Sequence, residues 1–302
     1  MTGPAANLLA MAKLALRGMG ARGGVGPLPP APRRRVAVER RETVPEPARL
    51  AGYLRATDGG RIAAFRGAEA LAPPTYCATW ETVAALELLS LALESLPLGG
   101  VVHLESELLP LRALRPGDRV RCRVELERTE TTARGLRLLL VARNWNAAEH
   151  LCSQSSAAFL VRPREAASVP PEERPAGGDG ELPAGWEELA RWGLRAGAGR
   201  RYALASGDFN PIHLWGWTAR PFGFRRPILH GFCTEAMVAN ALVERRFRGD
   251  PTALRRLRVV FRAPLLLPAR VRLLVGEEDG HQAFRVAGED GRVYASGEFV
   301  GS

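Results

Sequence analysis

The sequence predicts an α+β protein in which one pattern, a long apolar helix followed by antiparallel strands, occurs twice. Apolar helices are expected at residues 80–96 and 234–246, and alternating apolar and polar segments follow each of them. Between the two repeats, residues 163–184 are rich in proline, glycine and charge and lack an apolar period, as linkers do. A helix followed by strands, twice around one linker, indicates a duplication.

The composition is that of a globular protein in a reducing compartment. The chain has 302 residues, 46% hydrophobic and 25% charged, so a sizeable core is possible in one large or two ordinary domains. The four cysteines stand far apart without a Cys-x-x-Cys pair, which argues against a disulfide framework or a thiolate zinc site. No apolar run approaches the roughly 20 residues that cross a bilayer. We therefore expect a soluble, cytoplasmic protein without a membrane span.

The net charge of +10 comes almost wholly from arginine, because Lys13 is the only lysine. Genomic base composition explains such a preference for arginine over lysine better than a nucleic-acid-binding surface does. Basic and aromatic residues do not alternate as in a single-strand groove, and no zinc-finger spacing occurs. We expect no nucleic-acid partner, although a basic surface would favour anionic partners.

Residues 1–35 form a segment of their own, without an acidic residue. Residues 7–19 can form an amphipathic helix, and a tether rich in glycine, proline and arginine follows. The segment is either a targeting peptide or a short helix that packs on the domain, and the absence of serine favours the second interpretation.

The first repeat begins with a predicted strand at 36–42 and connecting structure. In the helix at 80–96, Thr79 is the expected N-cap, and Pro97 with the following glycines ends it. A helix that is apolar on nearly every side must be enclosed by other structure. The strands expected after it are 119–127, 135–145 and 151–161.

The second repeat begins at 186–194, which reads as a short helix or a strand. The helix at 234–246 follows, with Gly249 where a C-terminal cap would stand. The strands expected after it are 257–262, 271–275, 283–287 and 293–300.

A carboxylate, a carboxamide and an imidazole lie between that lead-in and the second helix. Asp208, Asn210 and His213 fall within six positions, and Gly207 and Pro211 restrict the backbone between them. A rigid turn can hold the carboxylate and the imidazole on one side of a pocket, where one water bridges them. General acid–base chemistry needs this arrangement.

The whole run resembles the signature of the MaoC-like dehydratases, the (R)-specific or type 2 enoyl-CoA hydratases. The aromatic residue of the signature is Tyr202, its Ser-Gly-Asp-x-Asn-Pro-x-His core is 206–213, and its downstream His-Gly is His230-Gly231. The resemblance implies a double hotdog fold, in which each half is a long apolar helix wrapped by a curved antiparallel sheet. The expected parts are an N-terminal helix and tether (1–35), a degenerate hotdog (36–162), the linker (163–184) and a catalytic hotdog (185–302).

The resemblance also implies the chemistry, which is hydration of trans-2-enoyl thioesters and dehydration of (3R)-hydroxyacyl thioesters of coenzyme A or an acyl carrier protein. Asp208 and His213 would share the reacting water, and Asn210 would hold the turn or the water. The N–H of Gly231 would bind the thioester oxygen at a helix N-terminus. No cofactor and no metal are expected, because Asp208 and His213 alone give too few ligands and no other histidine except His230 sits at ligand spacing.

Further expectations concern the surroundings of the site and the assembly of the chain. Ser206 ties down the turn, since no Gly-x-Ser-x-Gly elbow marks it as a nucleophile. His103 stands at the start of a strand and is structural, and residues 215–217 wall the pocket. The arginines at 225–226 are ordinary surface residues rather than phosphate ligands. A degenerate first half would leave room for a long acyl chain, and the chain is a possible homodimer.

Two rival functions remain open. A hotdog thioesterase carries an acid on or near the central helix, for which Glu235 is the candidate. A non-catalytic acyl-binding scaffold would use the fold without the chemistry, but the presence of both Asp208 and His213 favours an enzyme.

Overall fold

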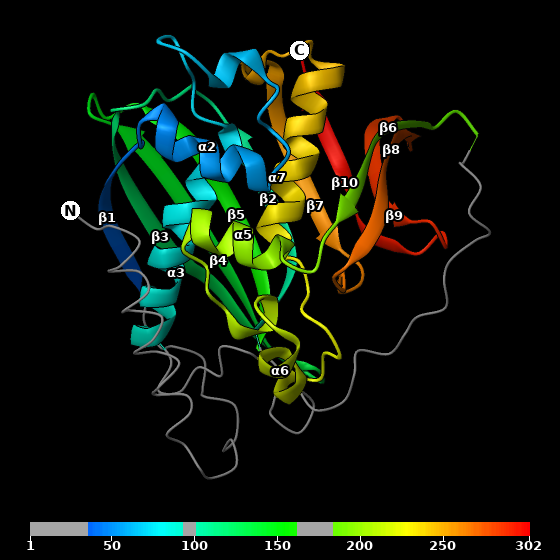
Figure 1. Cartoon of the computed structure of the whole chain (residues 1–302). Helices are drawn as coiled ribbons and strands as arrows, with labels where there is room; N and C mark the ends of the chain where they lie inside the picture. Colours follow the sequence, from blue (N-terminus) through cyan, green and yellow to red (C-terminus); the bar gives the residue numbers. More distant parts are fainter. Residues whose placement is uncertain (1–35, 93–100, 162–183) are drawn as a thin grey trace.

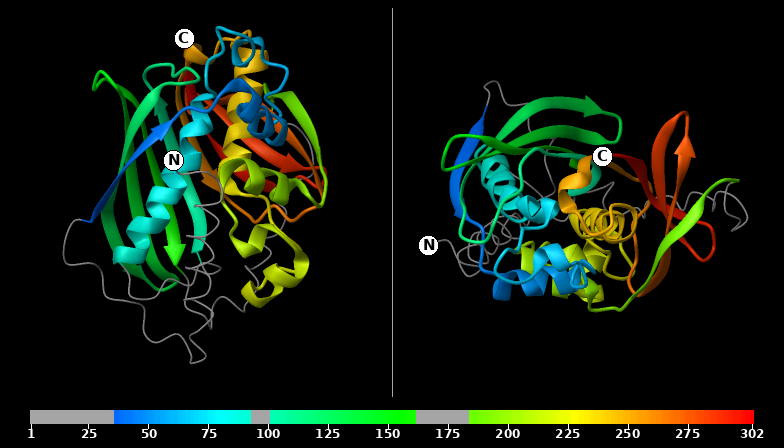
Figure 2. Two further views of the ribbon diagram at one scale, coloured as in Figure 1. Left: turned by 60° about the vertical axis from the view of Figure 1, so that its left-hand side comes forward. Right: turned by 90° about the horizontal axis from the view of Figure 1, so that it is seen from above.

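The computed structural model describes residues 36–92, 101–161 and 184–302. The helix and tether expected at 1–35 lie outside the described residues, and so does the expected linker apart from its last residue. The described chain forms one curved antiparallel sheet with helices on its concave side (Figures 1 and 2).

The sheet has ten strands in the described ranges, in the order β1-β3-β4-β5-β2-β7-β10-β9-β8-β6. The first five strands in this order form the N-terminal half and the last five form the C-terminal half. In the N-terminal half the strands are β1 (Ala37–Thr43), β2 (Val101–Pro110), β3 (Arg119–Thr132), β4 (Gly135–Asn146) and β5 (Leu151–Val161). In the C-terminal half they are β6 (Glu187–Leu194), β7 (Leu254–Phe261), β8 (Ala269–Glu278), β9 (His281–Gly288) and β10 (Val293–Gly301).

The two halves meet where β2 pairs with β7. Ser106 stands opposite Val259 and Leu108 opposite Leu257 in this antiparallel pair. Glu105 on β2 accepts hydrogen bonds from Arg137 on β4, at 2.5 Å, and from Arg258 on β7, at 3.3 Å. The backbone ladder and these ion pairs make the sheet continuous across the two halves.

The central helix of the N-terminal half is α3 (Ala78–Ala92). It packs on β3, β4 and β5 through Trp80, Ala84 and Leu88, which are buried among the apolar side chains of these strands. The expectation that Thr79 caps this helix is wrong, because a 3₁₀ turn at Pro74–Cys77 leads directly into it and Thr79 lies inside its first turn. Residues 93–96 of the expected helix lie outside the described residues.

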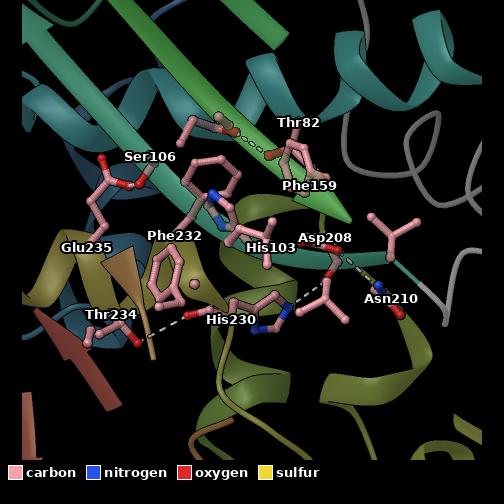
Figure 3. Close-up of a pocket in the computed structure, with 18 of the residues that line it drawn as sticks. Thr82, His103, Ser106, Phe159, Asp208, Asn210, His230, Phe232, Thr234 and Glu235 are labelled. Atoms are coloured by element: carbon pink, nitrogen blue, oxygen red, sulfur yellow. Dashed lines mark hydrogen bonds between the residues drawn. The ribbon is translucent and has the colours of Figure 1, made fainter. Parts of the chain in front are cut away.

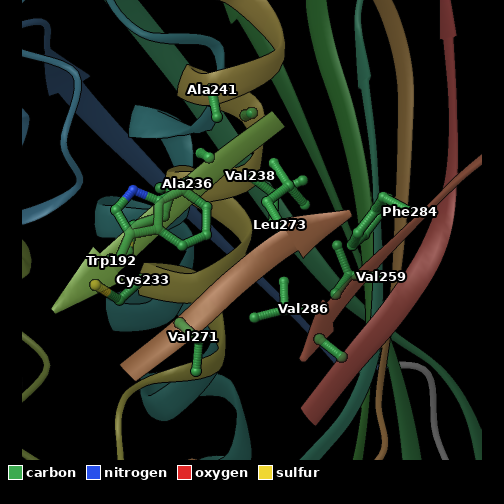
Figure 4. Packing of buried hydrophobic residues seen from close by; sticks show 14 of the residues in the cluster. Trp192, Cys233, Ala236, Val238, Ala241, Val259, Val271, Leu273, Phe284 and Val286 are labelled. Carbon is green, nitrogen blue, oxygen red and sulfur yellow. The ribbon is translucent and has the colours of Figure 1, made fainter. Parts of the chain in front are cut away.

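The central helix of the C-terminal half is α7 (Gly231–Ala241), which continues as a π-helical turn at Leu242–Arg246. It begins three residues earlier than the sequence predicts, at Gly231. Every residue from Cys233 to Ala241 is buried. Its neighbours in the core are apolar side chains of β6 to β10, including Trp192, Val271 and Phe284 (Figure 4).

Three shorter helices complete the described fold: α2 (Pro47–Ala56), α5 (Ala198–Ser206) and α6 (Gly216–Ala219). The segment of α2 was expected to be connecting structure, and β2 was predicted only through the expectation that His103 stands at the start of a strand. Asn240 on α7 donates a hydrogen bond to the carbonyl of Thr57 at 2.9 Å, which ties the end of α2 to the central helix. The segment at 186–194, left open between helix and strand, is the strand β6.

The predicted fold class is confirmed: the protein is a double hotdog, with one central helix against each half of a curved antiparallel sheet. Apart from β2, each strand of the sheet lies at a segment that the alternating pattern indicated or left open. No helix in the described ranges is both long and apolar enough to cross a membrane.

Candidate active site

The turn that carries the polar residues follows α5 directly. This helix ends at Gly207, which adopts a left-handed backbone with φ 81°, and glycine allows that conformation without strain. Ser206 donates from its hydroxyl to the carbonyl of Tyr202 at 2.9 Å and accepts from the N–H of Asp208 at 3.2 Å. Ser206 therefore stabilises the turn, as expected, by linking the end of the helix to the residue after the glycine.

Asp208 and Asn210 fold the next residues into a compact loop. The Oδ1 atom of Asp208 accepts from the N–H of Asn210 at 3.1 Å, and the Oδ1 atom of Asn210 accepts from the N–H of Ile212 at 3.3 Å. Asn210 thereby caps the 3₁₀ turn Pro211–His213. The second oxygen of Asp208, Oδ2, has no hydrogen-bond partner among the described residues, and Asp208 lines a cavity.

His213 is held in one tautomer by a backbone carbonyl. Its Nδ1 atom lies 2.9 Å from the oxygen of Ile228, so Nδ1 carries the proton and donates it. The other nitrogen, Nε2, is left as an acceptor without a partner in the described chain. Burial, helped by the neighbouring His230, lowers the pKa of His213 to about 3, while Asp208 opposes the change. The imidazole is therefore neutral near pH 7.

His230 supports the turn from the other side. Its Nε2 atom lies 3.0 Å from the backbone oxygen of Asp208 and donates to it. Its ring stacks on the ring of His213, with centroids 3.7 Å apart and planes inclined by 25°. Burial lowers the pKa of His230 to about 3. Both the carboxylate and the neighbouring imidazole are thus positioned through contacts with His230.

Ligand atoms of Asp208, His213 and His230 lie within 4.8 Å of one another, a group that could in principle hold a metal ion. Each imidazole already uses one nitrogen on a backbone carbonyl. The remaining nitrogen of His230, Nδ1, is enclosed by protein and is not open to the cavity. The arrangement fits acid–base chemistry better than metal binding.

Gly231 is the first residue of α7, and its N–H has no partner among the described residues, as is usual for the first turn of a helix. A Cβ atom on Gly231 would lie 2.5 Å from Nδ1 of His103 and 3.0 Å from the ring of Phe261. Only glycine fits here without displacing these rings. The open N–H stands at the positive end of the helix dipole.

A cavity of about 780 Å³ connects these residues with the N-terminal half (Figure 3). Asp208, Asn210, His213 and Gly231 line it from the C-terminal half. From the N-terminal half the lining is mainly apolar and comes from α3 and from the strands β2 to β5: Ala85, Leu86, Leu89, Val124, Leu140 and Phe159. The polar residues of the turn and the apolar lining from α3 and β2 to β5 therefore come from different halves.

His103 lies inside the cavity lining. Its ring centroid is 4.7 Å from that of Phe159, 4.5 Å from that of Phe232 and 4.6 Å from that of Phe261. Loss of water around the ring lowers its pKa to about 3, and His213 adds to this effect. The aromatic packing agrees with the structural role expected for His103, but its position beside Gly231 was not foreseen.

Of two other expectations about the pocket surroundings, the one for the tryptophans is wrong and the one for the arginines is confirmed. Trp215 and Trp217 stack on each other at the surface, 43% and 71% exposed, and neither lines the cavity, so the expectation that they wall the pocket is wrong. Arg225 and Arg226 are exposed, as expected for surface residues. The arginines that do line the cavity are Arg134, Arg262 and Arg292.

The sequence analysis missed a second polar group in the cavity, formed by Glu235 on α7 and Ser106 on β2 (Figure 3). Glu235 was considered only as the acid of a thioesterase. An acidic residue inside an otherwise apolar helix was the available signal. Its partner could not be inferred, because 129 residues separate the two in sequence.

Comparisons with known proteins agree with the geometry. A MaoC-like domain model matches residues 196–296, and a model of the FAS1-like dehydratase domain region matches residues 57–150. The chain is 35% identical over 185 residues to 3-hydroxyacyl-thioester dehydratase X of Mycobacterium tuberculosis, which covers 60% of this chain and 61% of the relative. It is 46% identical over 50 residues to the peroxisomal enoyl-CoA hydratase 2 of Arabidopsis thaliana, 17% of this chain and 16% of the relative.

The matched stretches span less than two thirds of the length of each curated relative. The likeness in structure extends further. The crystal structure of HtdX of Mycobacterium tuberculosis superimposes with a TM-score of 0.69 at 25% identity, over 89% of this chain and all of that one.

Proposed function

Because residues 196–296 match the model of the MaoC-like domain, we propose that the chain hydrates trans-2-enoyl thioesters reversibly to (3R)-hydroxyacyl thioesters. The names of two relatives, a 3-hydroxyacyl-thioester dehydratase and an enoyl-CoA hydratase, support this reaction class. The single observation that carries the proposal is the pair of open atoms, Oδ2 of Asp208 and Nε2 of His213, in one cavity beside the N-terminus of α7.

In the proposed hydration, one water lies between Asp208 and His213. The neutral His213 accepts a hydrogen bond from this water through Nε2, because its Nδ1 proton is committed to Ile228. Asp208 takes a proton from the water as the water oxygen forms a bond to C3 of the enoyl group. The same proton is then delivered to C2, so one water is added in total and the carboxylate is regenerated. Dehydration runs through the same steps in reverse.

Negative charge moves to the thioester oxygen while the bond to C3 forms. The N–H of Gly231 is a suitable donor for this oxygen, since it is free, fixed at a helix N-terminus and placed beside the turn. The absent side chain also lets the thioester approach the backbone closely. Removal of such a donor in comparable sites costs about 3–4 kcal/mol of transition-state stabilisation.

The cavity supports a substrate with an extended acyl chain. One face of α3, with Ala85, Leu86 and Leu89, contributes apolar lining and leaves space between the two halves. Arg134, Arg262 and Arg292 at the same cavity suit the phosphates of coenzyme A or an acidic carrier protein. We therefore propose that the N-terminal half accommodates the chain, and that its pocket takes long enoyl groups as well as short ones.

The test is the loss of enoyl-thioester absorbance with crotonyl-CoA and with a long-chain enoyl-CoA. The wild type is expected to hydrate both substrates. Asp208→Asn and His213→Ala are each expected to lose about 10²- to 10⁴-fold in kcat, because each removes one of the two groups that handle the water.

Asp279→Asn and His281→Ala serve as matched controls, since both residues are exposed at the β8–β9 turn, away from the cavity. Full hydration activity in the Asp208→Asn, His213→Ala double variant would contradict the mechanism. A strict preference for crotonyl-CoA would contradict the proposed role of the N-terminal half.

A further inference from the structure

Glu235 is the one acidic residue of α7, and it points into the cavity (Figure 3). It is only 5% exposed, and its Oε2 atom accepts a hydrogen bond from the hydroxyl of Ser106 at 2.5 Å. The other oxygen, Oε1, has no partner among the described residues and is not sealed off by neighbouring protein atoms. One carboxylate oxygen thus faces the cavity without a protein donor.

The N-terminal half contains a useful contrast in Glu81 on α3, which is also buried and lines the same cavity. Both oxygens of Glu81 are occupied: one accepts from Asn144 at 2.5 Å and the other from Ser155 at 2.7 Å. Asn144 is itself held by Trp80. Both carboxylate oxygens of Glu81 therefore have hydrogen-bond donors in the protein, whereas only one oxygen of Glu235 has such a donor among the described residues.

The position of Glu235 on α7 would bring it next to the acyl chain of the proposed substrate. It follows Gly231 by four residues, so it lies on the same face of α7, about 6 Å further along the helix axis. A thioester bound at the N–H of Gly231 would extend its chain past Glu235 several carbons beyond the reacting ones. Crotonyl groups are too short to reach it.

An alkyl chain in this place would remove water from Oε1 without replacing its hydrogen bond, and an unsatisfied charged or polar group is costly. A hydroxyl group on the chain would replace that bond. Burial raises the pKa of Glu235 to about 7, and the bond from Ser106 opposes this shift. A hydroxyl suits both protonation states, because it donates to a carboxylate and accepts from a carboxylic acid.

We propose that Glu235 and Ser106 form a polar subsite for the acyl chain, and that the substrate class is enoyl thioesters bearing a hydroxyl group several carbons beyond C3. This inference rests on the proposed hydratase function and names its substrate more closely. The site selects the hydroxylated chain over its plain counterpart because only the former leaves Oε1 hydrogen-bonded.

The experiment compares trans-2-octenoyl-CoA with analogues that carry a hydroxyl on the sixth, seventh or eighth carbon. In the wild type, kcat/KM for at least one hydroxylated analogue is expected to exceed that for octenoyl-CoA roughly tenfold or more. The quantity compared between variants is this ratio, which does not depend on the fraction of active protein. Glu235→Leu is expected to bring the ratio to one or below.

Glu235→Gln provides a second variant of nearly the same shape, which still bonds a hydroxyl and is expected to keep part of the preference. Glu81→Gln is the matched control in the other helix: its oxygens are already used by the protein, so the ratio is expected to stay near the wild-type value. An equal change of the ratio in Glu81→Gln and Glu235→Leu would overturn the assignment to Glu235.

Equal kcat/KM values for octenoyl-CoA and every hydroxylated analogue in the wild type would show the subsite to be wrong, while crotonyl-CoA hydration would leave the proposed function intact. Absence of hydration with all of these substrates would remove the proposed function itself. Release of free thiol that depends on Glu235 would assign this residue to thioester hydrolysis and overturn the subsite.

Discussion

The two halves of the molecule share a plan but differ at the start of the central helix. The helix α7 follows the extended backbone of His230, so the N–H of Gly231 stays open. The helix α3 follows a 3₁₀ turn, and the N–H of Ala78 already bonds to the carbonyls of Thr75 and Tyr76. The same fold can thus offer a free donor or none, depending on a few residues before the helix.

The helices also differ in how completely they are enclosed. From Cys233 onward α7 is buried throughout. In α3, Leu91 is 69% exposed, and Leu86 and Leu89 border the cavity. The half that carries the turn with Asp208 and His213 has a closed core, and the other half leaves space beside its helix. Under the proposed function, the chemistry and the room for the acyl chain are divided between the two repeats.

Among the variants that test the difference between the two halves, the largest effect is expected from closing the open donor in α7. Gly231→Ala places a methyl group against His103 and Phe261, which displaces the helix start or the substrate. We expect kcat/KM for crotonyl-CoA to fall by roughly 10²-fold or more, the loss typical of a removed oxyanion donor. Gly52→Ala on α2 is the control, because a Cβ atom there meets nothing within 4 Å. If Gly231→Ala is fully active, the thioester does not bind at this N–H.

A smaller effect is expected from the support of the turn. His230→Ala removes the donor that holds the carbonyl of Asp208, so the carboxylate shifts relative to the water. We expect kcat to fall about tenfold with little change in KM, since misplacing a reacting group weakens catalysis more than binding. His230→Gln retains a side-chain N–H and should recover part of the loss. Equal losses of kcat in both variants would mean that the hydrogen bond from His230 to the carbonyl of Asp208 is not what supports catalysis.

The smallest expected effect is on the pH dependence of the free energy of unfolding, through His103. His103 has a pKa of about 3 in the folded protein and near 6.5 when unfolded. Between these values the unfolded chain binds more protons, so the contribution of neutral His103 is present above pH 6.5 and is lost as the pH falls toward 3. Lowering the pH from about 7.5 to about 5.5 should cost about 1 kcal/mol through this residue.

His103→Phe should remove that share of the pH dependence, because phenylalanine suits a site already formed by three phenylalanine rings. Urea unfolding at the two pH values measures it. His213 and His230 remain, so part of the acid sensitivity persists. An unchanged difference between the two pH values in His103→Phe would show that its ring titrates normally in the fold.

Local patterns predicted much of this fold. The alternation in β3 is a strong signal because one face of this strand is buried and the other is exposed over much of its length. The apolar run of α7 is equally strong because protein surrounds the helix on all sides. The strand β2 was predicted only by the strand start at His103 and without a range, since it lies in the middle of the sheet and its sequence does not alternate cleanly. The start of α3 was misjudged because a 3₁₀ turn, rather than a capping side chain, precedes it.

In the candidate site, too, residues close together in sequence were predicted, and contacts between distant segments were not. Asp208, Asn210, His213 and Gly231 were predicted from one short run and its downstream glycine, and the fold brings them to one cavity. The stacking of His230 on His213 and the pairing of Glu235 with Ser106 depend on contacts between distant segments. Such contacts have no local signal, and neither does the outward direction of Trp217.

The pairing of β2 with β7 has a consequence for how the molecule comes apart. These strands are bonded to each other through the backbone, and each also belongs to the core of its own repeat. Neither repeat can lose its strands without exposing an edge of the other. Heating should therefore give one cooperative melting transition for both repeats, in which the floor of the cavity persists until the whole sheet is lost.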